Sequence, residues 1–350
     1  MPASHKAVAG LAPRAAVTIK DIAGALGLSH ATVSRALADH PKISAATKAS
    51  VREAARRMGY VPNGSAQNMR STHGTAIGVI VPDIQNDFYA SIAKIVADAA
   101  MERGFQLALS ITEDNPEREL KDLHSFVVSR AAGIIITPTS EPKRETLALL
   151  EGVRATQLVR QHPGIDKEAV IVDDQAATRA ATEHLLNYGH RRIAYVGTTT
   201  ELSCGVDRLA GFQAAMRHAA ADPGLYAVGL PRPEFAHHAV HGLMTRADRP
   251  TALVMGSSSL TVGALKALRS LRLSCPEDVS IVGYGDPEWF DLVGAGLTTV
   301  SLPVKAMGTY AISVLLARIK DDAAIQASPP TACRFPATLT IRNSTRPLAG

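Results

Sequence analysis

From residue 75 onward, the chain alternates short apolar runs with longer amphipathic stretches. Such runs are typical of strands buried inside a parallel sheet, and such stretches are typical of the helices that connect them. The expected strands are 77–81, 107–111, 133–137, 157–159, 170–172, 193–196, 252–255 and 279–284, and the expected helices include 88–103, 117–128, 175–187, 205–219 and 260–271. The pattern therefore predicts a doubly wound α/β body, which binds ligands beyond the carboxyl ends of its strands.

A different pattern occupies residues 17–40, which read as two short helices joined by a turn. Thr18 can cap the first helix and Ser29 the second, because a side-chain oxygen accepts hydrogen bonds from the free backbone N–H groups of a helix start. Gly27 suits the turn, since glycine adopts a positive φ without steric cost. A third helix is expected to begin after Ser44. A helix-turn-helix of this kind places its second helix in the major groove of DNA.

The positive charge of the chain is concentrated around the same segment. Residues 1–72 carry ten Lys or Arg and three acidic residues, a formal charge of +7, whereas the remainder carries 27 basic and 29 acidic residues, a formal charge of −2. A localised basic field beside a helix-turn-helix pattern is typical of a nucleic-acid-binding domain, whereas a simple helical hairpin needs neither the charge nor a third helix.

We predict that the polar and basic residues near the second helix contact DNA. Lys20 and Lys48 are expected to bind phosphates, while His30, Ala31 and Arg35 are expected to read base edges. The predicted contacts of this domain are Thr18, Lys20, Ser29, His30, Ala31, Thr32, Ser34, Arg35 and Lys48.

Several motifs, in order along the chain, resemble the lactose-repressor (LacI) family of transcription regulators. VTIKDIA at 17–23, ATVSRAL at 31–37 and MGYVPN at 58–63 stand where that family has its DNA-binding headpiece, and RLAGF at 208–212 and PEDVSIVGY at 276–284 match its body. The resemblance implies a homodimer that binds palindromic, double-stranded operator DNA, with a small-molecule effector controlling the affinity. Repression is the expected outcome.

The resemblance also implies how the chain is divided. We expect a mobile arm at 1–16, a helix-turn-helix domain at 17–62, a hinge helix at 63–72, and at 73–350 an effector-binding and dimerisation domain with two periplasmic-binding-protein-like lobes. The family hinge inserts an apolar side chain into the minor groove, and Met69 replaces the usual leucine. Asn63, Ala66 and Met69 are therefore predicted DNA contacts, and a flexible linker without this role is the alternative.

The residues predicted to bind the effector are Asp83, Phe88, Arg160, Arg208, Ser257, Asp286 and Trp289. In the family, the arginine at Arg208 commonly reaches the effector. Arg160 stands where an aspartate is common, Ser257 replaces part of an Asn-Asp pair, and Gly285 replaces an acid.

Two arginines facing one cavity would suit a carboxylate or a phosphate. We therefore expect an anionic effector, such as a sugar acid or another organic acid. One alternative is a neutral sugar. Another is that Arg160 only pairs with a neighbouring acid such as Asp173 or Asp174.

Other classes of function lack their signatures in this sequence. No nucleophile elbow, phosphate-binding loop or zinc-protease helix is found, so an enzyme is not expected. The three cysteines are scattered, and His237, His238 and His241 lack zinc spacing, so no metal or cofactor is expected. No stretch resembles a membrane span or a secretory leader, which predicts a cytoplasmic protein without a membrane partner. A small-molecule receptor without gene control is the remaining alternative, and the basic N-terminal domain argues against it.

Overall fold

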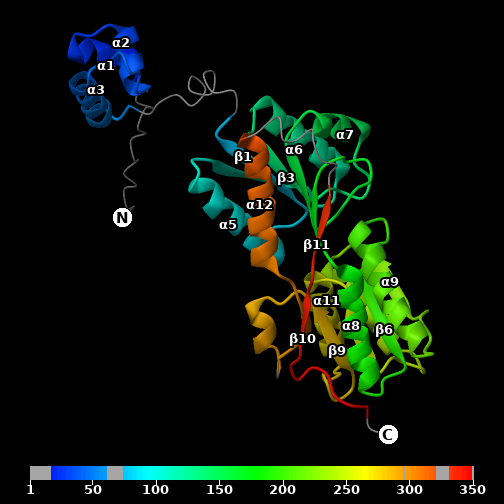
Figure 1. Cartoon of the computed structure of the whole chain (residues 1–350). Coiled ribbons are helices and arrows are strands. Elements are labelled where there is room, and N and C mark those ends of the chain that lie inside the picture. Colours follow the sequence, from blue (N-terminus) through cyan, green and yellow to red (C-terminus); the bar gives the residue numbers. More distant parts are fainter. Residues whose placement is uncertain (1–16, 61–73, 295, 321–330, 349–350) are drawn as a thin grey trace, which may run out of the picture. The chain divides into compact units, whose positions relative to one another are not determined.

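The computed structural model describes residues 17–60, 74–294, 296–320 and 331–348 (Figure 1). The chain separates into two compact units after Thr72. The first unit is helical and the second is α/β, so the predicted fold class is confirmed. The expected arm at 1–16 and the expected hinge at 63–72 lie outside the described residues.

The N-terminal unit contains three helices, which are α1 (Ile19–Leu26), α2 (His30–Leu37) and α3 (Ala45–Met58). Each begins at a predicted cap, because Thr18, Ser29 and Ser44 accept hydrogen bonds from backbone N–H groups of the first turn. Gly27 ends α1 at a φ of 65°, the left-handed conformation that glycine adopts most easily. Side chains from all three helices, led by Ile22, Val33 and Val51, form a small buried core.

The first lobe of the body is built on a parallel sheet in the order β11-β5-β4-β3-β1-β2. Its strands are β1 (Ala76–Val81), β2 (Gln106–Ile111), β3 (Gly133–Ile136), β4 (Ala155–Leu158), β5 (Ala169–Val172) and β11 (Ala332–Phe335). Helices α5 (Asp87–Met101) and α12 (Val304–Lys320) pack on one face, and α6 (Pro116–Val128) and α7 (Arg144–Glu151) pack on the other. Because both faces are covered, the central strands are almost continuously apolar.

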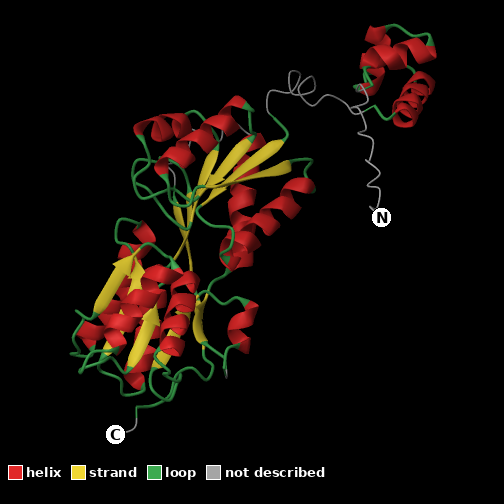
Figure 2. Ribbon diagram, turned by 180° about the vertical axis from the view of Figure 1, so that it is seen from behind, coloured by secondary structure: helices red, strands yellow, loops and turns green. Residues whose placement is uncertain are grey.

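The second lobe repeats this arrangement around a sheet in the order β12-β10-β9-β8-β6-β7, in which only β12 runs antiparallel to its neighbour. Its strands are β6 (Ile193–Thr198), β7 (Tyr226–Gly229), β8 (Ala252–Met255), β9 (Ser280–Tyr284), β10 (Thr298–Ser301) and β12 (Thr338–Thr340). Helices α8 (Asp174–Asn187) and α9 (Ser203–His218) cover one face, and α10 (Pro233–Met244) and α11 (Ser258–Ser270) cover the other. Figure 2 shows each sheet enclosed between helices.

The chain passes between the lobes after β5, after β10 and after β11. Strand β5 still belongs to the first sheet, so the first crossing to the second lobe follows Val172. The C-terminal segment then contributes α12 and β11 to the first lobe and β12 to the second. These crossings bring the carboxyl ends of both parallel sheets toward one cavity, where loops from both lobes meet.

Candidate functional site

Helix α2 exposes all three of the side chains that were predicted to read DNA bases. His30, Ala31 and Arg35 are exposed, as is Lys20 on α1. The opposite face of α2 is buried against the other helices of the unit. This division leaves one face of α2 accessible for contact with a nucleic acid.

Other predicted DNA contacts have partners within the unit. Thr18 and Ser29 act as helix caps, and Thr32 and Ser34 are half-buried. The Lys48 ammonium lies 3.1 Å from the Asp39 carboxylate. The other predicted contacts, Asn63, Ala66 and Met69, lie outside the described residues.

Asp39 also holds a second cation, Arg52, at 2.8 Å. Lys48 and then Arg52 lower the pKa of the Asp39 carboxyl. Arg52 was not among the predicted contacts. Its spacing of four residues from Lys48 on α3 was a usable signal, because residues four apart lie on the same face of a helix.

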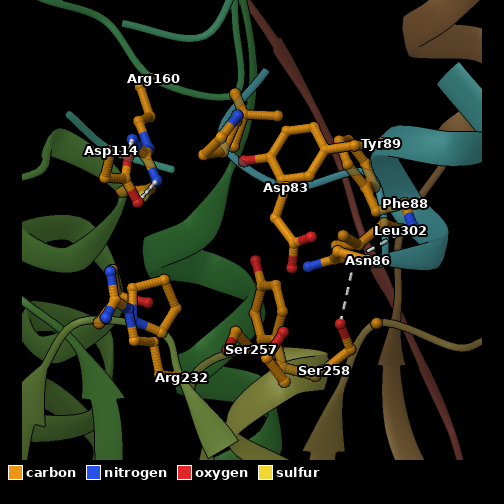
Figure 3. A pocket seen from close by; sticks show the side chains of 18 of the residues that line it. Asp83, Asn86, Phe88, Tyr89, Asp114, Arg160, Arg232, Ser257, Ser258 and Leu302 are labelled. Carbon is orange, nitrogen blue, oxygen red and sulfur yellow. Dashed lines mark hydrogen bonds and ion pairs between the residues drawn. The ribbon is translucent and has the colours of Figure 1, made fainter. Parts of the chain in front are cut away.

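A cavity of about 360 Å³ lies between the two lobes of the body. It is lined by five of the seven predicted effector-binding residues, namely Asp83, Phe88, Arg160, Arg208 and Ser257. Figure 3 shows side chains of both lobes converging on this space. The cavity has the size and the mixture of apolar walls and polar groups that small-molecule sites have.

Arg160 follows β4, and a tight turn directs it to the cavity. Its backbone N–H donates to Leu158 O at 2.7 Å, with Val159 between them at a φ of 66°, which is unfavourable for a β-branched residue. The guanidinium donates to both carboxylate oxygens of Asp114 and, at 3.1 Å, to Pro138 O. Asp114 is therefore its partner, rather than Asp173 or Asp174.

The charge of Arg160 is held in a nearly dry environment, because only 4% of its side chain is exposed. Burial opposes this charge, but Tyr89 and Asp114 raise the pKa of the guanidinium overall. An effector therefore meets Arg160 as one half of an ion pair.

Arg208 belongs to a second buried charge network. Its Nε donates to Asp174 Oδ1 at 2.8 Å, its Nη1 donates to Gly256 O at 2.8 Å, and its guanidinium lies 4.1 Å from the centre of the Tyr284 ring. The Tyr284 hydroxyl donates to the same Asp174 oxygen. Burial raises the pKa of Asp174, whereas Arg208 and Tyr284 oppose that rise. The cation, the ring and the carboxylate thus fix one another at the cavity wall.

The loop after β1 brings three more polar and aromatic groups to the cavity. Asp83 is half-buried and accepts a hydrogen bond from Gln85 N at 2.8 Å. Asn86 caps α5 and also accepts a hydrogen bond from Ser258 of the second lobe at 3.2 Å. Phe88 packs edge-on against Tyr89. The start of α5 therefore positions Asn86 and Phe88, and a turn of the preceding loop positions Asp83.

Two predicted effector contacts, Asp286 and Trp289, lie outside the cavity lining. Arg342, from the C-terminal segment, forms an ion pair with the Asp286 carboxylate at 2.8 Å. Trp289 lies in the 3-10 helix η1 (Glu288–Leu292), and its indole N–H donates to Asp87 of the first lobe at 3.2 Å. These two side chains make structural contacts, one of them between the lobes.

The sequence analysis missed several residues that line the cavity, among them Asp114, Thr198, Arg232, Ser258 and Tyr284. All five follow or end a parallel strand of their lobe, and for four of them that strand was predicted, so its end was the available signal. Arg232 follows β7, an edge strand that was not predicted because it is short and partly exposed.

The described ranges contain neither a metal-binding cluster nor a membrane-spanning helix. No three His, Cys, Asp or Glu side chains there are grouped so that they could hold a metal ion. Within the same ranges, no helix combines the length and the apolar character needed to cross a membrane.

Comparisons with known proteins agree with the two-part architecture. The family described as "Bacterial regulatory proteins, lacI family" matches residues 18–63, and the "Periplasmic binding protein-like domain" matches residues 182–345. The transcriptional regulator GalR of Salmonella typhimurium is 29% identical over 303 residues, 86% of this chain and 89% of the relative. The ribose operon repressor of Escherichia coli is 29% identical over 308 residues, 86% of this chain and 93% of the relative.

Among solved structures, the lac repressor dimer bound to operator and an anti-inducer covers 95% of this chain and 99% of its own length, with a TM-score of 0.81 and 24% identity. This likeness shows the shared fold. The sequence relatives are transcription regulators and not enzymes. With its helix-turn-helix unit and its two-lobed body, the chain belongs to the lacI family of DNA-binding transcription regulators.

Proposed function

We propose that this protein is a cytoplasmic repressor that binds a palindromic operator as a homodimer, and that an effector bound between the lobes controls its DNA affinity. The observation that carries the proposal is the cavity, because both lobes line it and Ser258 of one contacts Asn86 of the other. A ligand that touches both lobes favours the arrangement in which both contacts are made. A receptor without gene control would have no use for the exposed residues of α2.

In this proposal, different residues of the helix-turn-helix unit contact the phosphates and the bases of the DNA. Lys20 and Lys48 bind phosphates, which makes the affinity dependent on salt. His30, Ala31 and Arg35 contact base edges, and Thr18, Ser29, Thr32 and Ser34 contact the backbone near them. By family resemblance, Asn63, Ala66 and Met69 enter the minor groove.

The edge of the first sheet supports the homodimer. Strand β2 lies at this edge, and its Leu109 and Ile111 side chains are 38% and 39% exposed. Nearby along the chain, Met101 at the end of α5 is 71% exposed. An apolar sheet edge of this kind is a suitable surface for a second copy of the chain, and a two-fold dimer matches a palindromic site.

The unpaired charges of the lining support an anionic, hydroxylated effector, which is a sugar acid or another organic acid. Arg160 and Arg208 have carboxylate partners. Within the described ranges, Asp83 has no cationic partner, and Arg232 has no carboxylate partner. A hydroxy acid complements both, because its hydroxyl groups donate to Asp83 and its carboxylate accepts from Arg232.

A neutral sugar is the second candidate, and a specific observation favours it. Arg160 and Arg208 already have carboxylate partners, so neither arginine needs a ligand anion for charge balance. The repressor of a ribose operon is also among the relatives.

Thermal unfolding in the presence of candidate ligands tests the proposal. The panel contains neutral sugars, sugar acids, phosphorylated sugars and other carboxylates, because a ligand that binds only the folded state stabilises it by RT ln(1 + [L]/Kd). A rise in Tm confined to anions supports the anionic effector. A rise confined to neutral sugars overturns that assignment and supports the second candidate.

A further inference from the structure

We infer that Arg232 selects the effector by binding its carboxylate, with the Thr198 hydroxyl as a neighbouring donor. This inference rests on the proposed function, because it assigns one residue pair to the anionic group of the effector. Thr198 ends β6, and Arg232 follows β7, the strand paired with β6. Both residues line the cavity.

Arg232 differs from the other two arginines of the lining because it is exposed and has no carboxylate partner among the described residues. Arg160 and Arg208 are 4% and 6% exposed at their side chains; the partly buried Asp114 holds the first and the buried Asp174 holds the second. An incoming anion would have to displace Asp114 or Asp174, which leaves a buried charge without its partner. Arg232 is exposed, and no ion pair among the described residues involves it. It is therefore the guanidinium that a ligand carboxylate can reach without breaking an existing pair.

The local sequence fixes the backbone from which Arg232 extends. Pro233 follows it and disfavours the helical conformation at the preceding residue, and Arg232 is extended, with φ −111° and ψ 141°. Arg232 is also the N-cap of α10 but gives that helix no side-chain hydrogen bond. The start of a helix attracts negative charge, so α10 strengthens the attraction between the Arg232 guanidinium and a ligand carboxylate. Glu234 in the first turn opposes it, but Glu234 does not line the cavity.

Thr198 supplies an independent indication of a ligand. The residue is 2% exposed, and its hydroxyl has no hydrogen-bond partner within the described part of the chain. Buried hydroxyl groups almost always have a partner, and an exception at a cavity wall calls for one from the cavity. A ligand oxygen at this position would satisfy the hydroxyl.

The placement of Arg232 also suits discrimination between acids and sugars. Figure 3 shows Arg232 of the second lobe on the same side of the cavity as the Arg160–Asp114 pair of the first lobe. Asp114 is neutralised by Arg160, so it repels a ligand anion weakly. A carboxylate at Arg232 therefore forms a hydrogen bond in which both partners are charged. A hydroxyl group forms a weaker one, because only the arginine is charged.

The test uses the full-length protein and the melting temperature as a readout of binding. The probes are gluconate, glucuronate, galacturonate and citrate, with glucose and galactose as uncharged counterparts. Arg232→Gln removes the charge, Arg232→Lys keeps it, and Arg217→Gln is the control, because Arg217 is an exposed arginine of the same lobe outside the cavity. Thr198→Val removes the hydroxyl at nearly constant volume.

We expect at least one acid to stabilise the wild type and the Arg217→Gln control. Arg232→Gln should bind that acid about 10- to 100-fold more weakly, and Arg232→Lys should retain part of the affinity. Thr198→Val should weaken binding of the acid while leaving the ligand-free protein at least as stable, since it removes an unpaired buried hydroxyl.

Three outcomes would overturn the inference. If Arg232→Gln binds the acid as tightly as the wild type, Arg232 is not the selecting residue, and the anionic effector of the proposed function stands. If only glucose or galactose stabilises the wild type, or no acid does, the anionic effector fails, and the inference fails with it. If Arg232→Gln does not fold, wild-type affinity for the acid in both Arg232→Lys and Thr198→Val would count against the assignment.

Discussion

Ser258 and Asn86 join the two lobes at the rim of the cavity, where the Ser258 hydroxyl donates to Asn86 Oδ1 at 3.2 Å. Asn86 is the N-cap of α5, and Ser258 is the first residue of α11. The contact therefore links two helix starts that belong to different sheets. A ligand that changes the distance between the lobes acts directly on these two helices.

The hydrogen bond between Trp289 and Asp87 gives the first prediction. Trp289→Phe removes the indole donor and keeps an aromatic ring, so the arrangement of the lobes in this structure loses one contact between them. Effector affinity should fall by roughly 2- to 10-fold, which corresponds to about 0.5–1.5 kcal/mol. Calorimetric titration measures this, with Tyr226→Phe as the control for loss of an exposed polar aromatic group. An unchanged effector affinity would show that this contact does not help to hold the two lobes together around the ligand.

The buried pair of Asp174 and Arg208 gives a prediction about stability. Asp174→Asn leaves the Arg208 guanidinium buried without its counter-charge, and we expect a loss of about 3–5 kcal/mol in the free energy of unfolding. Urea unfolding measures this loss. Asp207→Asn is the control, because its partner Arg334 is half exposed, and it should cost no more than about 1 kcal/mol. Equal stability of Asp174→Asn and the wild type would contradict the role given to this pair.

Arg35 tests the DNA-reading face. Arg35→Ala should weaken binding to the operator by about 10- to 100-fold and should weaken binding to unrelated DNA much less, because a base contact carries specificity. The body should melt as in the wild type. Fluorescence anisotropy with both DNAs measures the ratio, and Arg103→Ala, an exposed arginine of the body, is the control. An unchanged preference for the operator would remove Arg35 from the set of base-reading residues.

Two buried histidines predict a pH dependence of stability. Burial lowers the pKa of His190 and of His184 below the ordinary value of 6.5. Between the lowered pKa and 6.5, the unfolded chain binds more protons than the folded chain, so the free energy of unfolding falls as the pH drops through this range.

The variant His190→Gln tests this pH dependence. His190 bonds to Thr251 at 2.8 Å and to Arg346 O at 3.1 Å, and the variant should lose part of the decrease between about pH 7.5 and about pH 5.5. Chemical unfolding at both pH values gives the difference. An identical decrease in the variant and the wild type would exclude His190 as a source.

The headpiece could be predicted from the sequence because its signals are local. Thr18, Ser29 and Ser44 each bond to a residue three positions ahead, and these bonds determine where the helices start. Most of the buried strands were equally visible as apolar runs, but β10 is buried and was not predicted, because three of its four residues are Thr or Ser. By contrast, β7, β11 and β12 are short and partly exposed, so their residues carry little strand signal.

The cavity could be predicted only as far as the strand ends. Arg160 was correctly expected to follow its strand, but its partner Asp114 is 46 residues away in the sequence. Asp286 follows β9 as expected, yet Arg342, 56 residues further on, holds its carboxylate away from the lining. Pairings over such distances are set by sheet order and by the C-terminal crossing, which local patterns do not encode.

The central claim is that ligand binding between the lobes controls DNA binding, and one measurement tests it directly. An operator selected from random DNA is titrated with the protein, with and without the ligand that stabilises it. We expect the ligand to change the operator Kd by roughly 5- to 150-fold, and the operator to change the Kd of the ligand by the same factor. An operator Kd that is unchanged at saturating ligand would contradict the account.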